Sequence, residues 1–185
     1  MNVKKTALLV IDVQNDYFPT GKMALFAPEH ALENIQRLEK AFHQAQAPII
    51  YIQHIAASPE APFFVAGTQG VKLHKDLAIN SASIIVEKQF PNSFFQTDLK
   101  EILDQLGVEQ VIVTGMMTHM CVDATSRAAA EYGYQPIVIA DATATKDLQY
   151  AGRTVIADDV QTAYLSSFQM FAKIETTQKY LSHTV

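Results

Sequence analysis

Short, unbroken apolar runs recur along this chain, and they constrain its fold more than any other feature. The runs of strand length are residues 7–11, 49–52, 84–86, 111–113 and 137–140, with a weaker sixth around 171–174. They are continuous rather than alternating, which is typical of strands covered on both faces, as in parallel sheets. Because parallel strands need long crossover connections, helices should lie between them.

Sets of mostly apolar residues at helical spacing lie between these runs. They are Leu32, Ile35, Leu38 and Phe42, then Leu99, Ile102, Leu103 and Leu106, and then Val160, Ala163, Tyr164 and Ser167. A further helix is expected from about Thr118 to Tyr132, with Thr118 as its N-cap. Alternating strands and helices predict an α/β fold: a Rossmann-like, three-layer α/β/α domain with a six-stranded parallel sheet and right-handed crossovers. We expect residues 1–185 to form one such domain.

The composition argues against several classes of function. Apolar residues make up 49% of the chain and charged residues 18%, which indicates a globular protein. The net charge of −5 argues against nucleic acid or an anionic membrane as the main partner. No apolar stretch approaches the roughly 20 residues that span a bilayer. A single cysteine cannot form an internal disulfide, so we expect a cytoplasmic protein.

That single cysteine, Cys121, follows a strand pattern and opens a predicted helix. Counted from Thr118, it falls at the third helical position, where free backbone N–H groups and the helix dipole favour an anion. Such sites lower a thiol pKa from about 8.5 to somewhere around 3.5–7.5, so we expect a thiolate. The alternative is a small buried hydrophobic residue, because free cysteines are often buried. The local sequence leaves both interpretations open.

Two charged residues directly follow other strand patterns. Asp12 follows the first run, and Lys88 closely follows the third. Open α/β folds collect their active-site groups at the carboxyl ends of strands, so we expect Asp12, Lys88 and Cys121 to share one crevice. There a carboxylate could take the thiol proton, and a cation within about 4–6 Å would favour both anions. The alternatives are a capping or loop carboxylate and a solvated lysine.

Three motifs together carry a family resemblance. They are Asp-Val-Gln-Asn-Asp at 12–16, Lys88 followed by Pro-Asn-Ser-Phe at 91–94, and Gly-Met-Met-Thr-His-Met-Cys-Val at 115–122. In this order they resemble the isochorismatase-like cysteine hydrolases, a superfamily that includes the nicotinamidases. The likeness runs through nearly the whole chain. It implies the strand order 3-2-1-4-5-6, which the apolar pattern alone does not give.

The resemblance also implies the roles of site residues. Asp12, Lys88 and Cys121 would be the catalytic triad, with Asp12 as general base. The backbone N–H groups of Met117 and Cys121 would form an oxyanion hole. The peptide bond between Met116 and Met117 would be cis.

The reaction that the resemblance implies is thiolate attack on an amide-like carbonyl, followed by hydrolysis of a thioester, with no cofactor. We therefore expect a metal-independent cysteine hydrolase (an amidohydrolase) that cleaves a C–N bond of a small amide or ureido substrate. The alternative within the family is isochorismatase-type hydrolysis of a vinyl ether. The alternative outside it is a catalytically idle binding or scaffold subunit. The resemblance further implies a homo-oligomer, a dimer or larger.

One departure from the nicotinamidases concerns metal binding. Those enzymes carry an Asp-x-His pair and a further histidine after the second strand, and these residues hold a metal ion. Here the corresponding segment is Ile52-Gln53-His54, and the next histidine, His74, lacks the expected setting. Because a single histidine is a poor metal site, we expect no metal and no nicotinamidase activity.

The remaining expectations concern the substrate pocket and its surroundings. Six residues flank the catalytic positions and are candidates for substrate binding: Gln14, Phe18, His54, Phe90, Phe95 and His119. Core packing is an equal alternative for each aromatic residue. Asn15 and Asp16 should brace the first loop rather than perform chemistry. The irregular stretch from Ala56 to Ser83 should cover the site, form an interface or fold onto its own domain.

Overall fold

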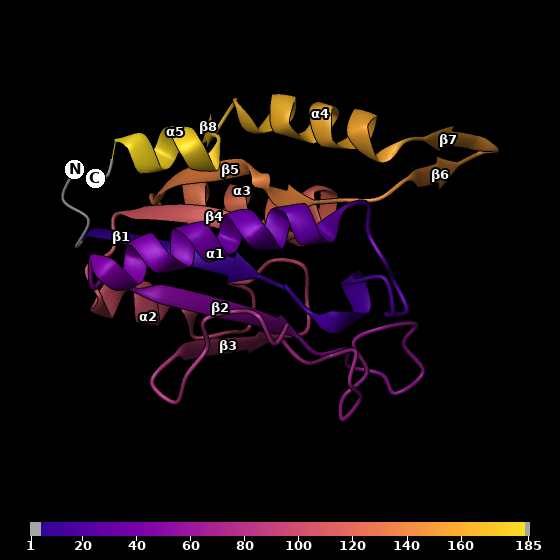
Figure 1. Cartoon of the computed structure of the whole chain (residues 1–185), viewed down its shortest axis with the longest axis horizontal. Coiled ribbons are helices and arrows are strands. Elements are labelled where there is room, and N and C mark those ends of the chain that lie inside the picture. The colour runs from indigo at the N-terminus through magenta and orange to yellow at the C-terminus, as the bar shows by residue number, and fades with distance from the viewer. Residues whose placement is uncertain (1–4, 184–185) are drawn as a thin grey trace.

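A six-stranded parallel sheet forms the centre of the computed structural model, which describes residues 5–183 (Figure 1). Its strands are β1 (Thr6–Ile11), β2 (Ile49–His54), β3 (Ile84–Lys88), β4 (Gln110–Met116), β5 (Gln135–Ala144) and β8 (Lys173–Glu175). The order across the sheet is β3-β2-β1-β4-β5-β8, and every neighbouring pair is parallel. The predicted order and fold class are confirmed, with β8 as the sixth strand.

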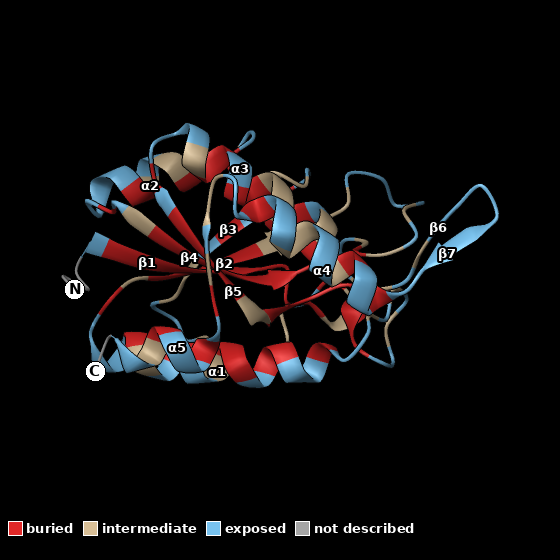
Figure 2. Ribbon diagram, turned by 90° about the horizontal axis from the view of Figure 1, so that it is seen from above, coloured by how far each residue is buried: buried red, intermediate tan, exposed pale blue. Residues whose placement is uncertain are grey.

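Helices cover both faces of this sheet (Figure 2). On one face lie α1 (Pro28–Gln44) and α5 (Thr177–Ser182), and on the other lie α2 (Leu99–Gln105), α3 (Asp123–Glu131) and α4 (Ala157–Phe168). The helices turn their buried residues toward the sheet, as the predicted apolar stripe of α1 requires.

The central strand β1 is buried along its whole length. Successive side chains of a strand point to opposite faces, so Leu8 and Val10 join the core beneath α1. Leu9 and Ile11 join the core on the other face, beneath α2 and α3. Fully burying such a side chain contributes roughly 1.5–3 kcal/mol. The end of β1, where Asp12 begins, is therefore held from both faces.

The strands β1 and β4 approach unusually closely at their carboxyl ends. Ile11 pairs with Gly115, whose φ is +113°, a region that side chains rarely adopt. A Cβ atom at this glycine would lie 2.0 Å from the carbonyl oxygen of Ile11. Only glycine permits this contact, so the backbones of the two strands touch at this edge of the sheet.

The long loop between β2 and β3 folds onto its own domain, which is one of the three predicted alternatives. Phe64 is buried against Tyr17, with the ring centroids 4.7 Å apart. Val71 also joins the core, and its carbonyl accepts a hydrogen bond from Gln14 at 2.7 Å. The loop therefore forms a wall beside the end of β1.

Several short elements were not expected from the sequence. They are the 3₁₀ turn η2 (Asn15–Tyr17), the helix α5 and an antiparallel ribbon of β6 (Leu148–Tyr150) and β7 (Arg153–Val155). None is long enough to show a clear apolar period. The helix predicted from about Thr118 is present, and it begins with the helical turn η3 (Thr118–Val122) before α3. Within residues 5–183, no helix combines the length and apolar character that crossing a bilayer requires.

Candidate active site

Three chemically active side chains meet at the carboxyl edge of the sheet. Asp12 directly follows β1, Lys88 is the last residue of β3, and Cys121 lies in η3 after β4. The Nζ atom of Lys88 lies 2.9 Å from Oδ2 of Asp12. A carboxylate oxygen of Asp12 and the Sγ atom of Cys121 lie within 4.8 Å of each other. The predicted convergence of these residues on one crevice therefore agrees with the geometry.

Lys88 and Asp12 form a fully buried ion pair. Burial acts to lower the pKa of Lys88, but the pKa is raised overall, chiefly by the negative charge of Asp12, so the amine is an ammonium. Its Nζ also donates a hydrogen bond to the carbonyl of Pro91 at 2.9 Å. The lysine is thus held on two sides and cannot turn away from the carboxylate.

The carboxylate of Asp12 is unusual because neither of its buried oxygens accepts a regular hydrogen bond from the described residues. The backbone here is also strained, with a φ of +51° for a residue that is not glycine. Its backbone N–H is fixed by a 3.0 Å hydrogen bond to the carbonyl of Ile52. The oxygens are therefore positioned but free to accept a proton from a substrate, a water or the thiol.

The predicted lowering of the Cys121 pKa is wrong. The side chain is only 3% exposed, and burial raises the pKa of the thiol, with a further increase from the negative charge of Asp12. Lys88 opposes both effects but does not overcome them. With burial as the largest effect and Asp12 adding to it, the resting cysteine is a neutral thiol near neutral pH.

The turn that carries Cys121 also differs from the prediction. Its N-cap is Met117, and Thr118 lies inside the turn with its buried hydroxyl unpaired among the described residues. The turn is a π-helix that passes directly into α3, a geometry that is frequent at functional sites. The peptide bond between Met116 and Met117 is cis, as the resemblance implied.

His54 completes a group of atoms of the kind that bind metals. One donor atom each from Asp12, His54 and Cys121 lies within 4.8 Å of the others. Burial lowers the pKa of His54, Asp12 acts to raise it and Lys88 acts to lower it, so the ring is neutral near neutral pH. However, the ammonium of Lys88 already neutralises Asp12, and it would repel a cation bound at the same carboxylate. The donor set therefore fits a resident metal poorly.

Two predicted pocket residues do lie beside the reacting groups. Phe90 and Phe95 form an edge-to-face pair with their centroids 4.9 Å apart. Together with Ile55 and Lys88 they line a cavity of about 270 Å³. Both rings are partly exposed, so they form the outer wall of the cavity rather than the core.

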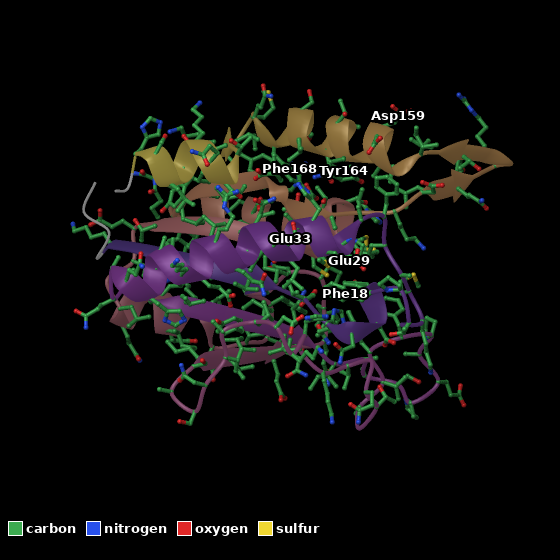
Figure 3. All side chains as sticks on the ribbon, in the orientation of Figure 1. Phe18, Glu29, Glu33, Asp159, Tyr164 and Phe168 are labelled. Carbon is green, nitrogen blue, oxygen red and sulfur yellow. The ribbon has the colours of Figure 1, made fainter. Side chains whose placement is uncertain are left out.

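Gln14 and Phe18, two other candidates for substrate binding, have different positions. Gln14 is buried, and its amide donates to the carbonyls of His54 and Val71 while its oxygen accepts from the His54 N–H. Phe18 packs on His74 with centroids 4.2 Å apart. Figure 3 shows Phe18 below the part of α1 that carries Glu29 and Glu33, with which it lines a separate cavity. Neither side chain is available to a substrate at Cys121.

His119 is anchored by a residue that the sequence analysis missed. Its Nδ1 lies 2.6 Å from the hydroxyl of Thr145, at the end of β5, and its ring packs against Tyr164 of α4. Burial lowers its pKa, with a smaller effect of Lys146 in the same direction. The signal that could have identified Thr145 is its position: it directly follows a strand, as Asp12 does.

Asp16 and Asn15 brace the first loop, as predicted. The carboxylate of Asp16 accepts hydrogen bonds from the backbone N–H groups of Phe64 at 2.7 Å and Lys22 at 3.2 Å. The amide of Asn15 donates to the carbonyl of Gln69 at 2.9 Å. These contacts tie η2 to the long loop and leave no free acceptor for chemistry.

Comparison with protein-family models gives one match, an isochorismatase domain over residues 6–179. The isochorismatase family protein YddQ of Bacillus subtilis is 44% identical over 177 residues, covering 95% of this chain and 98% of the relative. Nicotinamidase 3 of Arabidopsis thaliana is 30% identical over 156 residues, covering 78% of this chain and 75% of the relative.

Two crystal structures have very similar backbones. An isochorismatase hydrolase from Oleispira antarctica has a TM-score of 0.93 and 38% identity, with 97% of each chain covered. A cysteine hydrolase from Pseudomonas syringae pv. phaseolicola 1448A has a TM-score of 0.93 and 28% identity, covering all of this chain and 94% of the other.

Proposed function

The chain belongs to the isochorismatase family and is a hydrolase, and from this premise we propose that it cleaves a C–N bond of a small amide or ureido substrate. The reaction uses Cys121 as nucleophile, Asp12 as general base and Lys88 as the group that holds the base in place. It passes through a thioester and requires no metal ion. The observation that supports the proposal is the buried cluster of these three residues, in which Asp12 is paired with the Lys88 ammonium at 2.9 Å and accepts no backbone hydrogen bond from the described residues.

The first half of the reaction forms the thioester. Because the resting cysteine is a neutral thiol, its proton moves to Asp12 as the sulfur attacks the substrate carbonyl carbon. The backbone N–H groups of Met117 and Cys121 stabilise the negative charge on the carbonyl oxygen. Such donors are commonly worth about 2.7–4 kcal/mol of the barrier. The C–N bond then breaks, and Asp12 returns the proton to the leaving nitrogen.

The second half releases the acid. A water molecule attacks the thioester while Asp12 takes its proton, and the sulfur leaves and recovers that proton as the acid departs. Lys88 stays charged throughout and keeps the carboxylate oriented by its 2.9 Å contact. The hydrogen bond from its Nζ to the carbonyl of Pro91 gives the ammonium a second fixed partner.

The size and lining of the cavity support a small substrate. The space beside Lys88 is about 270 Å³, just below the range of roughly 300–1,000 Å³ that ligand pockets usually have. The rings of Phe90 and Phe95 offer an apolar wall, and Glu87, Lys88, Gln89 and Gln96 supply the polar part of the lining. This combination suits a compact acyl group better than a polymer or a peptide.

The proposal is tested by screening small primary amides, ureido acids, nicotinamide and isochorismate, followed by acid quench and intact-mass measurement. We expect an acyl adduct on Cys121 with an amide or ureido compound, and no turnover by Cys121→Ala. The neighbouring, exposed Met120 offers a matched control, and Met120→Ala should retain activity. Turnover of isochorismate by Cys121→Ala, with no adduct in the wild type, would favour vinyl-ether hydrolysis instead.

A separate experiment tests the absence of a resident metal. Dialysis against a chelator should leave kcat unchanged, and added Zn²⁺ should inhibit if it binds by displacing Lys88 from Asp12. His54→Gln removes one donor of the candidate set, so it should weaken inhibition by Zn²⁺. Rapid hydrolysis of nicotinamide that a chelator abolishes would contradict the metal-free mechanism.

A further inference from the structure

Buried hydroxyl groups connect the loop after β3 to helix α3, close to the three reactive residues. Thr125 lies in α3, one helical turn after Cys121, and Ser93 lies in the loop that begins after Lys88. Both Thr125 and Ser93 are fully buried. Their hydroxyl oxygens lie 2.8 Å apart, and the backbone N–H of Ser93 donates to Oγ1 of Thr125 at 3.1 Å. Two hydrogen bonds therefore join the loop to the helix out of contact with water.

One assignment of protons satisfies all the contacts of the Thr125 hydroxyl. A hydroxyl donates one hydrogen bond and accepts two. Oγ1 of Thr125 lies 3.5 Å from the carbonyl oxygen of Pro91, which can only accept, so the Thr125 proton is directed at that oxygen. The two hydrogen bonds that Oγ1 accepts then come from the N–H and the hydroxyl of Ser93. With this assignment the full capacity of the Thr125 hydroxyl is used.

The carbonyl of Pro91 links the two hydroxyls to the active site. It accepts a hydrogen bond from Nζ of Lys88 at 2.9 Å, and the same Nζ lies 2.9 Å from Oδ2 of Asp12. An ammonium has three protons and no acceptor, so the acceptors around it determine its position. Pro91 is one of these acceptors, and Thr125 contacts the same carbonyl oxygen. A displacement of that carbonyl would move the ammonium or leave it with Asp12 alone.

From these contacts we propose that Thr125 is a positioning residue for catalysis, which holds the Pro91 carbonyl where it orients the ammonium of Lys88. This role rests on the proposed function, because it gives Thr125 a part in the reaction of Cys121. The helix that follows Cys121 then positions two reactive groups. It carries the nucleophile directly, and it holds Lys88 through the Pro91 carbonyl.

The position of Lys88 matters because its charge acts on both partners of the proton transfer. Lys88 opposes the effects that raise the pKa of the Cys121 thiol, and the attraction between two charges weakens as their distance grows. Lys88 also pairs with Asp12, which exchanges a proton with the sulfur. A misplacement of about 1 Å can cost on the order of 100-fold in rate. The Thr125 hydroxyl should therefore contribute to kcat more than to substrate binding.

A purely structural role is the alternative, because the same loop also carries the cavity wall. Phe90 and Phe95 flank Ser93 in the sequence, and both line the cavity beside Lys88. If Thr125 only held this wall in place, its loss would raise KM. The proton of Thr125 is directed instead at the carbonyl that Lys88 uses, which favours the positioning role.

Steady-state kinetics with the substrate found by the screen separate the two roles. Thr125→Val keeps the shape of the side chain without its hydroxyl, and we expect kcat to fall about 10-fold with KM changed by less than about twofold. Thr125→Ser restores the hydroxyl and should recover most of the lost kcat. A raised KM with an unchanged kcat would overturn the proposal, and so would a Thr125→Ser variant as slow as Thr125→Val.

The neighbouring Ser126 offers a matched control. Its hydroxyl is also buried in α3, but it has no hydrogen-bond partner among the described residues. Ser126→Ala should therefore leave both kcat and KM unchanged. A fall in kcat equal to that of Thr125→Val would show that any buried hydroxyl of this helix has the same effect, and it would overturn the specific role of Thr125.

Alkylation of Cys121 by iodoacetamide tests the link to Lys88 without a substrate. Because Lys88 opposes the raised pKa of the thiol, Thr125→Val should slow alkylation, roughly threefold for a rise of about half a pKa unit. In the background of Lys88→Met the same substitution should have no further effect, because Thr125 acts through the lysine. An equal effect in both backgrounds would overturn the proposal.

The two experiments also separate this role from the proposed function. If no compound of the screen is hydrolysed but the alkylation rates are coupled, amide hydrolysis is wrong and the link between Thr125 and Lys88 stands. If an amide is hydrolysed and Thr125→Val has the kcat of the wild type, the link is wrong and the hydrolysis stands. Circular dichroism shows whether each variant folds. If Lys88→Met does not fold, the kinetics of Thr125→Val and Thr125→Ser decide.

Discussion

Asp12 and Asp16 lie four positions apart in the same segment, and both carboxylates are buried. Each oxygen of Asp16 accepts a backbone hydrogen bond, from Lys22 or from Phe64. Neither oxygen of Asp12 accepts a backbone hydrogen bond from a described residue, and Oδ2 lies 2.9 Å from the ammonium of Lys88 and 4.0 Å from Nδ1 of His54. Burial therefore does not separate a reactive carboxylate from a structural one. What separates the two is whether backbone N–H groups donate hydrogen bonds to the carboxylate oxygens.

A third buried carboxylate, Glu39 of α1, falls on the structural side of this comparison. One oxygen accepts hydrogen bonds from the hydroxyl of Tyr51 at 2.7 Å and from the N–H of Ala78 at 3.0 Å. It thereby ties α1 to β2 and to the end of the long loop. Asp16 and Glu39 hold that loop at two points, and Asp12 lies beside it without taking part.

The largest effect should come from removing the charge of Asp12. Asp12→Asn keeps the shape of the side chain but cannot accept a proton, so we expect kcat to fall by roughly 10⁴-fold. The same change removes one of the causes that raise the pKa of Cys121 and leaves Lys88 unpaired beside the sulfur. Alkylation of Cys121 by iodoacetamide should therefore become faster, and its pH midpoint should move down.

These two measurements separate a general base from a merely structural carboxylate. If Asp12 only held the fold, Asp12→Asn would still make the thiol more reactive, but kcat of the folded enzyme would stay near that of the wild type. Lys88→Met is the matched control, because it removes the only cause that lowers the pKa of Cys121 and should make alkylation slower still. In the wild type, the rate of alkylation should show no cysteine titration near the usual pKa of about 8.5.

A smaller effect, on stability instead of chemistry, should follow Asp16→Ala. The substitution leaves the N–H groups of Phe64 and Lys22 without their acceptor, at a cost of about 3 kcal/mol in the free energy of unfolding. Urea denaturation measures this loss, and kcat of the folded enzyme at low temperature should stay near that of the wild type. A kcat loss comparable to that of Asp12→Asn would break the distinction between the two aspartates.

The smallest effect should come from Glu39. Glu39→Ala removes the acceptor of Tyr51 and Ala78 and should cost about 1–3 kcal/mol. Glu39→Gln keeps an acceptor oxygen but has no charge, so it should cost less. The pair of variants separates the loss of the hydrogen bonds from the loss of the charge.

The pH dependence of Glu39 has a defined sign. Burial raises the pKa of Glu39 in the folded protein, although Tyr51 and Ala78 act to lower it. The folded state then binds the proton more tightly than the unfolded state, so this contribution to stability is fully present below the unfolded pKa. It is lost as the pH rises through the folded pKa. As the pH rises over this window, the free energy of unfolding of the wild type should fall relative to that of Glu39→Gln. A rise of the wild type relative to the variant would contradict the assignment.

The sequence predicted where the reactive groups meet because the end of each apolar run marks the end of a strand. Unbroken apolar runs located Asp12 and Lys88 at the carboxyl edge of a sheet, and the motif around Cys121 added the third position. The pattern could not reveal the balance of charges among them. Nor could it reveal that Cys121 would be buried, which is the largest cause of the raised pKa of its thiol, with the charge of Asp12 adding to it and Lys88 opposing it.

The sequence also did not predict the roles of side chains whose position depends on the path of a loop. Gln14 lies two positions after Asp12. Only the path of the long loop shows that its amide already donates hydrogen bonds to the backbone carbonyls of His54 and Val71. Phe18 points into another cavity because η2 turns the chain away from the site. The ribbon of β6 and β7 was not predicted because strands of three residues are too short to show a pattern of apolar and polar residues.

The backbone contact at Gly115 has a consequence for how such an enzyme can acquire new substrates. Because β1 and β4 pair with no room for a side chain at Gly115, the spacing between the segments that carry Asp12 and Cys121 is set by backbone pairing rather than by adjustable side chains. Substitutions in the core can therefore change the packing between sheet and helices without changing the distance between the catalytic residues. New substrate preferences would then arise in peripheral segments, such as the one that carries Phe90 and Phe95. These segments can change while the positions of the catalytic residues stay the same.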